Sequence, residues 1–179
     1  MKDNNTSTLR SIGRCIVLCG VVLSLVGCGG HYPADPEGTL NRVSGGTIRA
    51  GISHEPPWTD ISSGENTEEN PGGIEVELLE DYAESIDAEV EWQAGGEEQL
   101  VGLLAEQELD VVVGGLTDKS PWESDAAITT SYAESKGIAG STDKQVMATQ
   151  MGENAFMMSL EEFLLNENVD QQLPEEMRP

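Results

Sequence analysis

The sequence predicts one α/β domain with a mostly parallel sheet and flanking helices, and three observations support this. Between residues 47 and 113, β-forming runs alternate with amphipathic helical patterns in a β-α-β-α-β series. Helices of ~10–15 residues between strands are the connections that parallel strands require, with right-handed crossovers. The part of the chain that follows an N-terminal targeting segment and a linker is ~130 residues long, which suits one domain.

The first strand is expected at Thr47 to Ile52, where β-forming residues alternate with small ones. Residues 53–73 are polar and rich in proline and glycine, so they are expected to form a loop. The next segment carries apolar residues at a spacing of four, which predicts an amphipathic helix with an acidic outer face. These residues are Ile74, Leu78, Tyr82 and Ile86.

A half-buried strand is expected at Ala88 to Gln93, where apolar and polar residues alternate. A second helix follows, with Leu100, Leu103 and Leu104 on one side. Leu109 to Val113, apolar apart from Asp110, is then expected to form a short strand. Gly114-Gly115 closes this strand at its carboxyl end, where ligands bind in open α/β sheets.

The C-terminal part contains two further β-prone runs and one helix. We expect Ala126 to Ala133 and Gln145 to Gln150 to pair as antiparallel strands, with Ser135 to Lys144 as the loop between them. The last helix has a narrow apolar face. This face consists of Phe156, Leu160, Phe163 and Leu164. Residues 166–179 are polar and are expected to fray.

The N-terminal residues 1–27 are typical of an export signal. Basic residues precede an apolar run, Cys15 to Val26, that is too short to span a bilayer. The run ends in Leu25-Val26-Gly27-Cys28, which resembles the lipobox of bacterial lipoproteins, whose cysteine receives a diacylglycerol. A buried strand that contains cysteines is the alternative, but it does not explain the order basic, apolar, small, cysteine. We therefore expect Cys28 to be lipidated and to attach the mature protein to the extracytoplasmic face of a membrane.

The composition of the mature chain excludes several classes of function. Cys15 and Cys19 leave with the signal, so neither an intrachain disulfide nor a cysteine metal cluster is expected. Residues 28–46 lack apolar periodicity and are expected to form a flexible tether before a domain that spans residues 47–165.

The chain is strongly acidic, with a formal net charge of -24. The signal carries three basic residues and one acidic residue, so its removal takes this charge to -26. Such a surface repels nucleic acid and anionic lipid headgroups, so nucleic-acid binding is excluded. We interpret the acidity as a solvated surface suited to a salty medium, because the acidic residues are spread along the chain. A cation-collecting face is the alternative.

Four motifs occur in a defined order between residues 47 and 132. They are Pro56-Pro57-Trp58 after the first strand, Gly73-Ile74-Glu75-Val76-Glu77-Leu78 at the first helix, Leu109 to Thr117, and Pro121 with Ser131-Tyr132. Together they resemble the first lobe of the family 3 extracellular solute-binding proteins, the amino-acid receptors of ABC importers, which have the type 2 periplasmic-binding-protein fold. The family writes Gly-Phe-Asp-Val-Asp-Leu at the first helix. The stretch from Val146 to Glu161 resembles the family's return strand and final helix.

The resemblance implies a small polar solute held at the carboxyl end of the sheet. The implied binding residues are Trp58, Ile74, Glu75, Gly114, Gly115, Leu116 and Thr117. Glycines let the backbone approach a zwitterion closely, Trp58 would form an aromatic wall, and the Thr117 hydroxyl would bind a charged end. In the alternative interpretation the glycines only form a turn, Trp58 fills the edge of the sheet and Thr117 caps a loop.

Two departures from the family bear on function. Where the family has Thr-Pro-Glu-Arg, with an arginine that grips the solute's α-carboxylate, this chain has Ser120-Pro121-Trp122-Glu123. Lys119 is the only nearby cation. In addition, 47 residues follow Tyr132, too few for a second lobe of ~100 residues. We therefore expect a one-lobed protein whose junction lies near residues 135–144.

The sequence favours a binding module of an ABC-type importer, with a permease as partner and weak or no affinity for free amino acids. An enzyme would need chemistry from His54 with Glu55 and Asp60, but there is no second histidine nearby and no nucleophile pattern, so we expect neither catalysis nor a metal or cofactor. His54 is expected to face solvent. An acidic lipoprotein that docks on a membrane partner without a solute is the second hypothesis.

Overall fold

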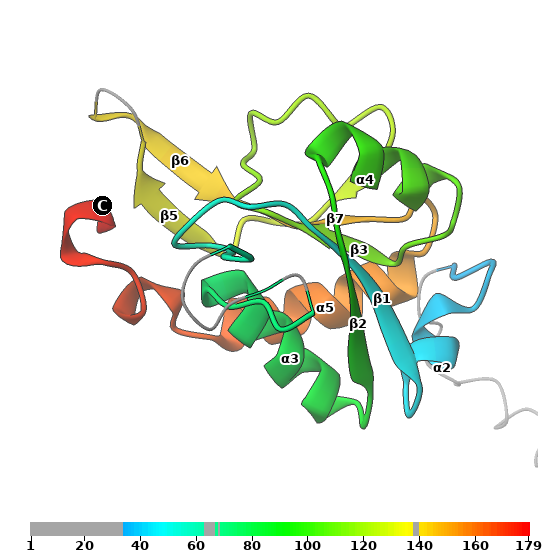
Figure 1. The fold of residues 1–179 in the computed structure, drawn as a ribbon. Helices are drawn as coiled ribbons and strands as arrows, with labels where there is room; N and C mark the ends of the chain where they lie inside the picture. The colour runs from blue at the N-terminus through cyan, green and yellow to red at the C-terminus, as the bar shows by residue number, and fades with distance from the viewer. Residues whose placement is uncertain (1–33, 63–66, 68, 138–139) are drawn as a thin grey trace, which may run out of the picture. The chain divides into compact units, whose positions relative to one another are not determined.

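A five-stranded sheet with the strand order β2-β1-β3-β7-β4 forms the centre of the molecule (Figure 1). The computed structural model describes residues 34–62, 67, 69–137 and 140–179, which belong to the unit Pro33–Pro179. Residues 1–33, and with them the expected signal and Cys28, lie outside the described residues. No helix within the described ranges is long and apolar enough to cross a membrane.

The strands run mostly in one direction. β1 (Thr47–Ile52) is parallel to β2 (Glu89–Ala94) and to β3 (Val111–Val113). β7 (Ala148–Thr149) is antiparallel to both of its neighbours, β3 and β4 (Ala127–Ile128), so the other four strands point the same way. This confirms the α/β fold with a mostly parallel sheet.

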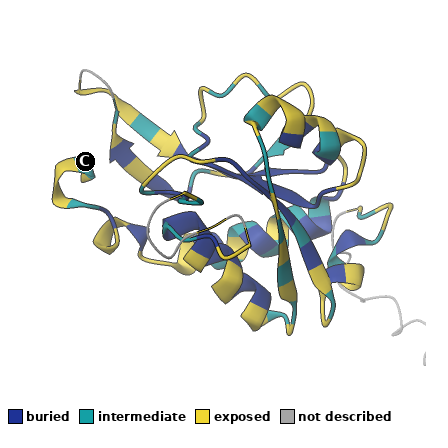
Figure 2. Ribbon diagram, in the orientation of Figure 1, coloured by how far each residue is buried: buried dark blue, intermediate teal, exposed yellow. Residues whose placement is uncertain are grey.

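Helices cover both faces of the sheet (Figures 1 and 2). On one face, α3 (Ile74–Ser85) and α5 (Asn154–Asn166) bury Tyr82 and Phe156 against alternate residues of β1. On the other face, α4 (Glu97–Ala105) buries leucines against β3. A fully buried large apolar side chain contributes about 1.5–3 kcal/mol, so these two layers hold the sheet without disulfides.

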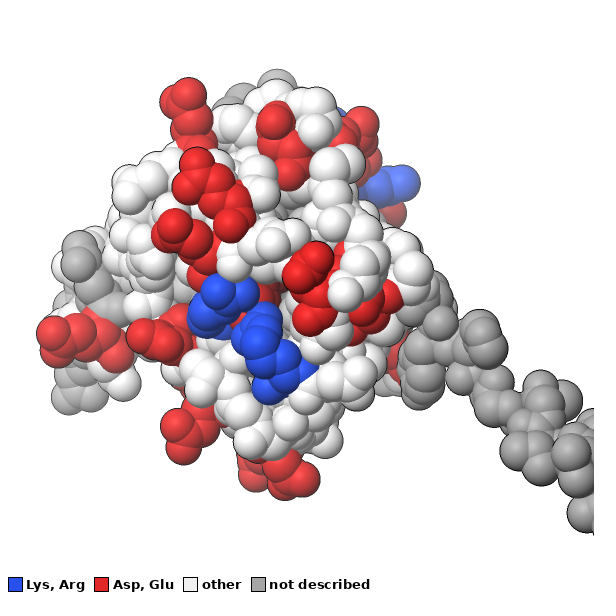
Figure 3. Space-filling view, turned by 90° about the vertical axis from the view of Figure 1, so that its right-hand side faces the viewer, with Lys and Arg blue, Asp and Glu red and all other residues white. Residues whose placement is uncertain are grey.

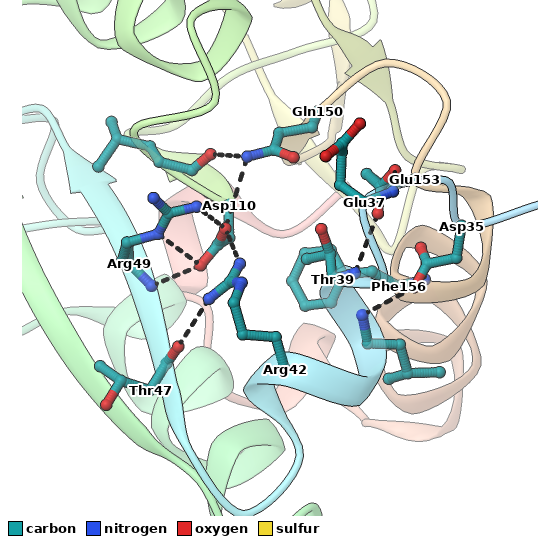
Figure 4. Close-up of polar contacts among 12 residues, drawn as sticks. Asp35, Glu37, Thr39, Arg42, Thr47, Arg49, Asp110, Gln150, Glu153 and Phe156 are labelled. Carbon is teal, nitrogen blue, oxygen red and sulfur yellow. Dashed lines mark hydrogen bonds and ion pairs between the residues drawn. The ribbon is translucent and has the colours of Figure 1, made fainter.

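The expected tether is wrong for residues 34–46, because this segment is packed on the domain. It contains α2 (Thr39–Val43), which contacts α5 and β1. Buried Glu153 accepts hydrogen bonds from the N–H groups of Glu37 and Thr39, both at 3.0 Å (Figure 4). The polar contacts of two carboxylates, Asp35 and Glu153, hold this segment, and apolar periodicity does not reveal such contacts.

The pKa values of this acidic pair diverge. Burial raises the pKa of Asp35, and the neighbouring Glu153 adds to this effect. Burial would also raise the pKa of Glu153, but the hydrogen bonds that Glu37 and Thr39 donate lower it overall. The two carboxyl groups are therefore shifted in opposite directions, and the ionised form of Glu153 is the one that the hydrogen bonds from this segment stabilise.

The C-terminal tail is also folded, contrary to the expectation that it frays. It forms two short helical turns, η2 (Val169–Gln171) and η3 (Glu175–Met177), beside the β5–β6 hairpin. Val169 and Leu173 are almost completely buried in the core that α3 and α5 line. Two apolar residues four positions apart were too weak a signal in an otherwise polar stretch.

At the junction, the expected pairing of residues 126–133 with 145–150 is confirmed. Ile128 faces Ala148 in the main sheet, and Ala133 faces Gln145 in a separate hairpin. The expected loop at 135–144 is too long, because β5 (Ala133–Lys136) and β6 (Thr142–Gln145) extend into it. A hairpin thus closes the chain where a second lobe would be inserted.

Asp110, directly before β3, is completely buried and binds two arginines. It accepts hydrogen bonds from Arg42 of α2 and, at 2.6 Å, from Nη2 of Arg49 of β1 (Figure 4). On the side toward which α2 lies in Figure 1, basic side chains gather in one group among acidic ones (Figure 3). This network ties α2 to the amino ends of β1 and β3, opposite the edge expected to bind a solute.

Candidate functional site at the carboxyl edge

The parallel strands β1, β2 and β3 end at the same edge of the sheet, called here the carboxyl edge. It is formed by the residues that follow these strands: Ser53 to Glu55 after β1, Gly95 to Glu97 after β2 and Gly114 to Asp118 after β3. Ligands bind at this edge in open α/β folds because backbone groups are free there.

The buried carboxylate of Glu75, in the first turn of α3, binds the loop that follows β3. Its Oε2 accepts hydrogen bonds from the N–H groups of Gly114 at 2.7 Å and Gly115 at 2.9 Å. Its Oε1 accepts a hydrogen bond from the Tyr132 hydroxyl at 2.5 Å. Glu75 therefore joins α3, the glycine loop after β3 and the segment that leads into the hairpin.

This environment shifts the pKa of both partners. Burial raises the pKa of Glu75, which is 0% exposed, although the hydrogen bonds from Tyr132, Gly115 and Gly114 act in the opposite direction. Burial, together with the charge of Glu75, raises the pKa of Tyr132 well above 10.0. The Tyr132 hydroxyl thus keeps its proton and remains a donor to Glu75.

Gly114 and Gly115 adopt conformations and contacts that favour glycine. Their φ angles are 155° and 67°. A Cβ on Gly114 would lie 1.8 Å from Oγ of Ser53, and a Cβ on Gly115 would lie 2.7 Å from Cγ of Glu55. The glycines therefore do allow a close approach, but it is the chain's own side chains that approach.

Three of the sequence-predicted binding residues lie in the core. Trp58, Ile74 and Leu116 are 4%, 7% and 2% exposed. Trp58 packs in the core with α3 and does not form an exposed aromatic wall, in line with the alternative that it fills the edge of the sheet. Apolar residues that flank a solute loop satisfy the same sequence pattern whether they face the solute or the core.

Thr117 is half-buried and caps a turn. Its Oγ1 accepts a hydrogen bond from the Lys119 N–H at 3.3 Å, and its own N–H donates to Oγ of Ser120 at 3.0 Å. The backbone N–H and the hydroxyl oxygen of Thr117 thus have partners within the chain. Its hydroxyl proton has no partner among these hydrogen bonds.

The cation that the family uses has no replacement in the segment where the family has it. Lys119 donates a hydrogen bond to Oδ1 of Asp143 on β6 at 2.6 Å, and this bond raises its pKa. Trp122 donates through Nε1 to Oε2 of Glu97 at 3.1 Å, which attaches the segment to the start of α4. Glu123 is exposed.

His54 faces solvent, as expected from the sequence. Its side chain is 41% exposed, with Nδ1 3.6 Å from Oδ1 of Asp60 and Nε2 3.2 Å from Oγ of Ser62. Within the part of the chain that the structure describes, no cluster of three or more His, Cys, Asp or Glu side chains could hold a metal ion.

Two grooves are lined by residues other than those of the carboxyl edge. One, of about 420 Å³, lies between the β5–β6 hairpin and the C-terminal tail, and the other, of about 480 Å³, lies between the end of α3 and β2.

Ser53, which directly follows β1, was not identified from the sequence as a residue of this edge. Its position at a strand end, beside a loop with two glycines, was the available signal.

Comparisons with known proteins agree with this fold. Residues 48–176 match the bacterial extracellular solute-binding proteins, family 3. A search among curated protein sequences gave no match.

Solved structures give the same picture. The arginine-bound form of domain 1 from TmArgBP is 19% identical with a TM-score of 0.58, covering 72% of this chain and 95% of that one. The arginine-bound form of truncated ArgBP from T. maritima is 12% identical (TM-score 0.58, 72% and 98% covered). The ancestral amino acid-binding protein AncCDT-1, a precursor of cyclohexadienyl dehydratase, is 11% identical (TM-score 0.60, 70% and 92% covered). At these identities the structures show the shared fold. The family match covers most of the chain, which therefore belongs to family 3 of the bacterial extracellular solute-binding proteins.

Proposed function

We propose that this chain is a one-lobed solute-binding module of an ABC-type importer, anchored outside the cytoplasm by a lipid on Cys28. We further propose that it is not an enzyme and that it binds free amino acids weakly or not at all. The observation that carries the proposal is the carboxyl edge itself. It has the family's glycine loop, but the N–H groups of Gly114 and Gly115 and the nearest cation, Lys119, are engaged within the chain.

The weak affinity follows from the charges. Micromolar binding of a small solute corresponds to about -8 kcal/mol. Losing one charge-assisted hydrogen bond costs ~1.5–3 kcal/mol, which is a factor of ten or more. Here the family's arginine is replaced by Glu123, whose negative charge opposes a carboxylate, and Lys119 is held by Asp143.

A fold of one lobe does not by itself exclude binding. The structure of domain 1 from TmArgBP is of an arginine-bound form, so in that protein one domain holds arginine. The low affinity proposed for this chain therefore depends on its own edge residues. A permease partner fits the family, and the lipid would keep the module near it.

Calorimetry at molar NaCl with a panel of amino acids tests the solute part of the proposal. We expect dissociation constants of about 1 mM or weaker, and any amino acid bound below ~10 μM would contradict it. Processing in a bacterial host tests the anchor separately. The Cys28→Ser variant should remain as an unprocessed precursor in the membrane fraction, and a mature-sized product from it would exclude lipidation at Cys28.

A further inference from the structure

Carboxylates predominate among the charged groups at the carboxyl edge. Glu55 follows β1, Glu97 begins α4 after β2, and Asp118 follows β3. Lys119 is paired with Asp143, and His54 lies beside Asp60. The edge therefore offers carboxylates to an incoming solute, and its cations already have partners.

Glu55 is positioned where a solute would approach the glycine loop. Its Cγ would touch a Cβ on Gly115 at 2.7 Å, so the stem of Glu55 lies directly on that glycine. Its side chain is exposed. A solute carboxylate near Gly115 would meet this negative charge, whereas an ammonium or guanidinium group would be attracted to it.

The N–H groups of the two glycines in the loop are not available to an anion either. The N–H groups of Gly114 and Gly115 both donate to Glu75, whose carboxylate is completely buried beneath them. An internal carboxylate thus occupies the two donors that would otherwise receive an anionic group. It also adds negative charge below the loop whenever it is ionised.

An independent feature, the Ser53 hydroxyl, points to a polar ligand at the same place and is able to accept a hydrogen bond from an N–H donor. Ser53 is 8% exposed, and among the described residues its Oγ has no hydrogen-bond partner. This hydroxyl lies against Gly114, 1.8 Å from where a Cβ would stand. A buried polar group without a partner is costly, and a hydroxyl oxygen accepts a hydrogen bond from an ammonium or guanidinium group.

From these four features we infer that the carboxyl edge selects small organic cations that lack a carboxylate, namely amines and guanidines. The inference rests on the proposed solute-binding function and adds the class of solute. This chain has Glu123 where the family has arginine, which fits this class of solute. A solute without a carboxylate does not require a cation in the site to bind it.

Matched pairs of compounds test the inference directly. Arginine and agmatine differ only by the carboxylate, as do lysine and cadaverine. Calorimetry of the mature protein at molar NaCl should give at least tenfold tighter binding for the member of each pair without the carboxylate. Equal affinities, or tighter binding of the amino acid, would overturn the inference.

Variants separate this inference from general charge attraction. Glu55→Gln should weaken agmatine binding at least fivefold, whereas Glu84→Gln, an exposed change on α3 away from the edge, should leave it unchanged. Equal loss in both variants would mean nonspecific attraction to an acidic surface and would overturn the inference. Matching melting temperatures confirm that both variants are folded.

A charge-reversal variant distinguishes failure of this inference from failure of the proposed function. Glu123→Arg should bind arginine better than the wild type does. The ratio of its affinity for agmatine to its affinity for arginine should be smaller than in the wild type. If this variant binds arginine but the wild type binds no amine, the lobe is a solute-binding module and the inferred solute class is wrong. If no variant binds any compound of the panel, both fail.

Discussion

Replacement of Glu75 should show how much this buried carboxylate contributes to the fold. Glu75→Ala leaves three donors without an acceptor: the N–H groups of Gly114 and Gly115 and the Tyr132 hydroxyl. Each unsatisfied buried group costs about 1–3 kcal/mol, so we expect the three together to cost about 3–9 kcal/mol. That is a large part of the 5–15 kcal/mol that stabilises a typical domain.

The milder variant Glu75→Gln has a distinct pH dependence. The pKa of Glu75 in the folded protein is raised above its ordinary value of 4.5. Its contribution to stability is therefore fully present below that ordinary value and is lost as the pH rises through the folded pKa. Glutamine does not titrate, so the cost of Glu75→Gln should be largest near ~pH 4 and should shrink toward ~pH 8.

Urea unfolding of the wild type and Glu75→Gln at several pH values, in molar NaCl, measures this difference. Glu77→Gln is the matched control, because Glu77 is exposed in the same first turn of α3. The control should show no such dependence. A cost of Glu75→Gln that stays constant or grows with pH would refute the assigned direction of the pKa.

Three further predictions follow from the fold. The melting temperature should rise from low to molar NaCl, because salt screens the repulsion within a chain whose net charge is -24. A melting temperature that stays constant or falls would mean that neighbouring basic groups already compensate the acidic ones. Phe156→Ala should cost about 3–5 kcal/mol in chemical unfolding, since Phe156 is completely buried against Tyr82, and a loss below ~1 kcal/mol would contradict that packing. Glu153→Gln should destabilise the protein at neutral pH and progressively less as the pH falls. The reason is that the pKa of Glu153 is lowered in the folded protein, so its contribution to stability is lost in acid. A cost of the substitution that increases in acid would contradict the hydrogen bonds that Glu153 accepts from Glu37 and Thr39.

The sequence predicted the strands and helices with strong periodicity. The spacing of Leu78 and Tyr82 is typical of an amphipathic helix, and the apolar run before Gly114 is typical of a buried strand. The structure has α3 and β3 at these places. The packing of residues 34–46 was not predictable in this way. That segment is held by Asp35 and Glu153 through backbone hydrogen bonds, and such contacts join residues more than 100 positions apart.

The sequence pointed to the loop after β3 but did not reveal the contacts that its residues make. Gly114 and Gly115 do mark the loop after β3, yet the sequence could not show that Glu75 and Ser53 approach them from within the protein. Trp58 illustrates the same difficulty, because an aromatic residue beside a loop suits a solute wall and a core position equally well. Side-chain direction at such positions depends on packing between distant segments.

The central structural claim is that the strands before and after the β5–β6 hairpin pair with each other, so that the lobe closes on itself. Backbone NOEs in the protein expressed without residues 1–28 test it directly. We predict cross-strand contacts between Ile128 and Ala148 and between Ala133 and Gln145, the facing pairs of the junction. Contacts within β1, β2 and β3 without contacts at these two pairs would mean that the hinge segments diverge, and would contradict the one-lobed fold.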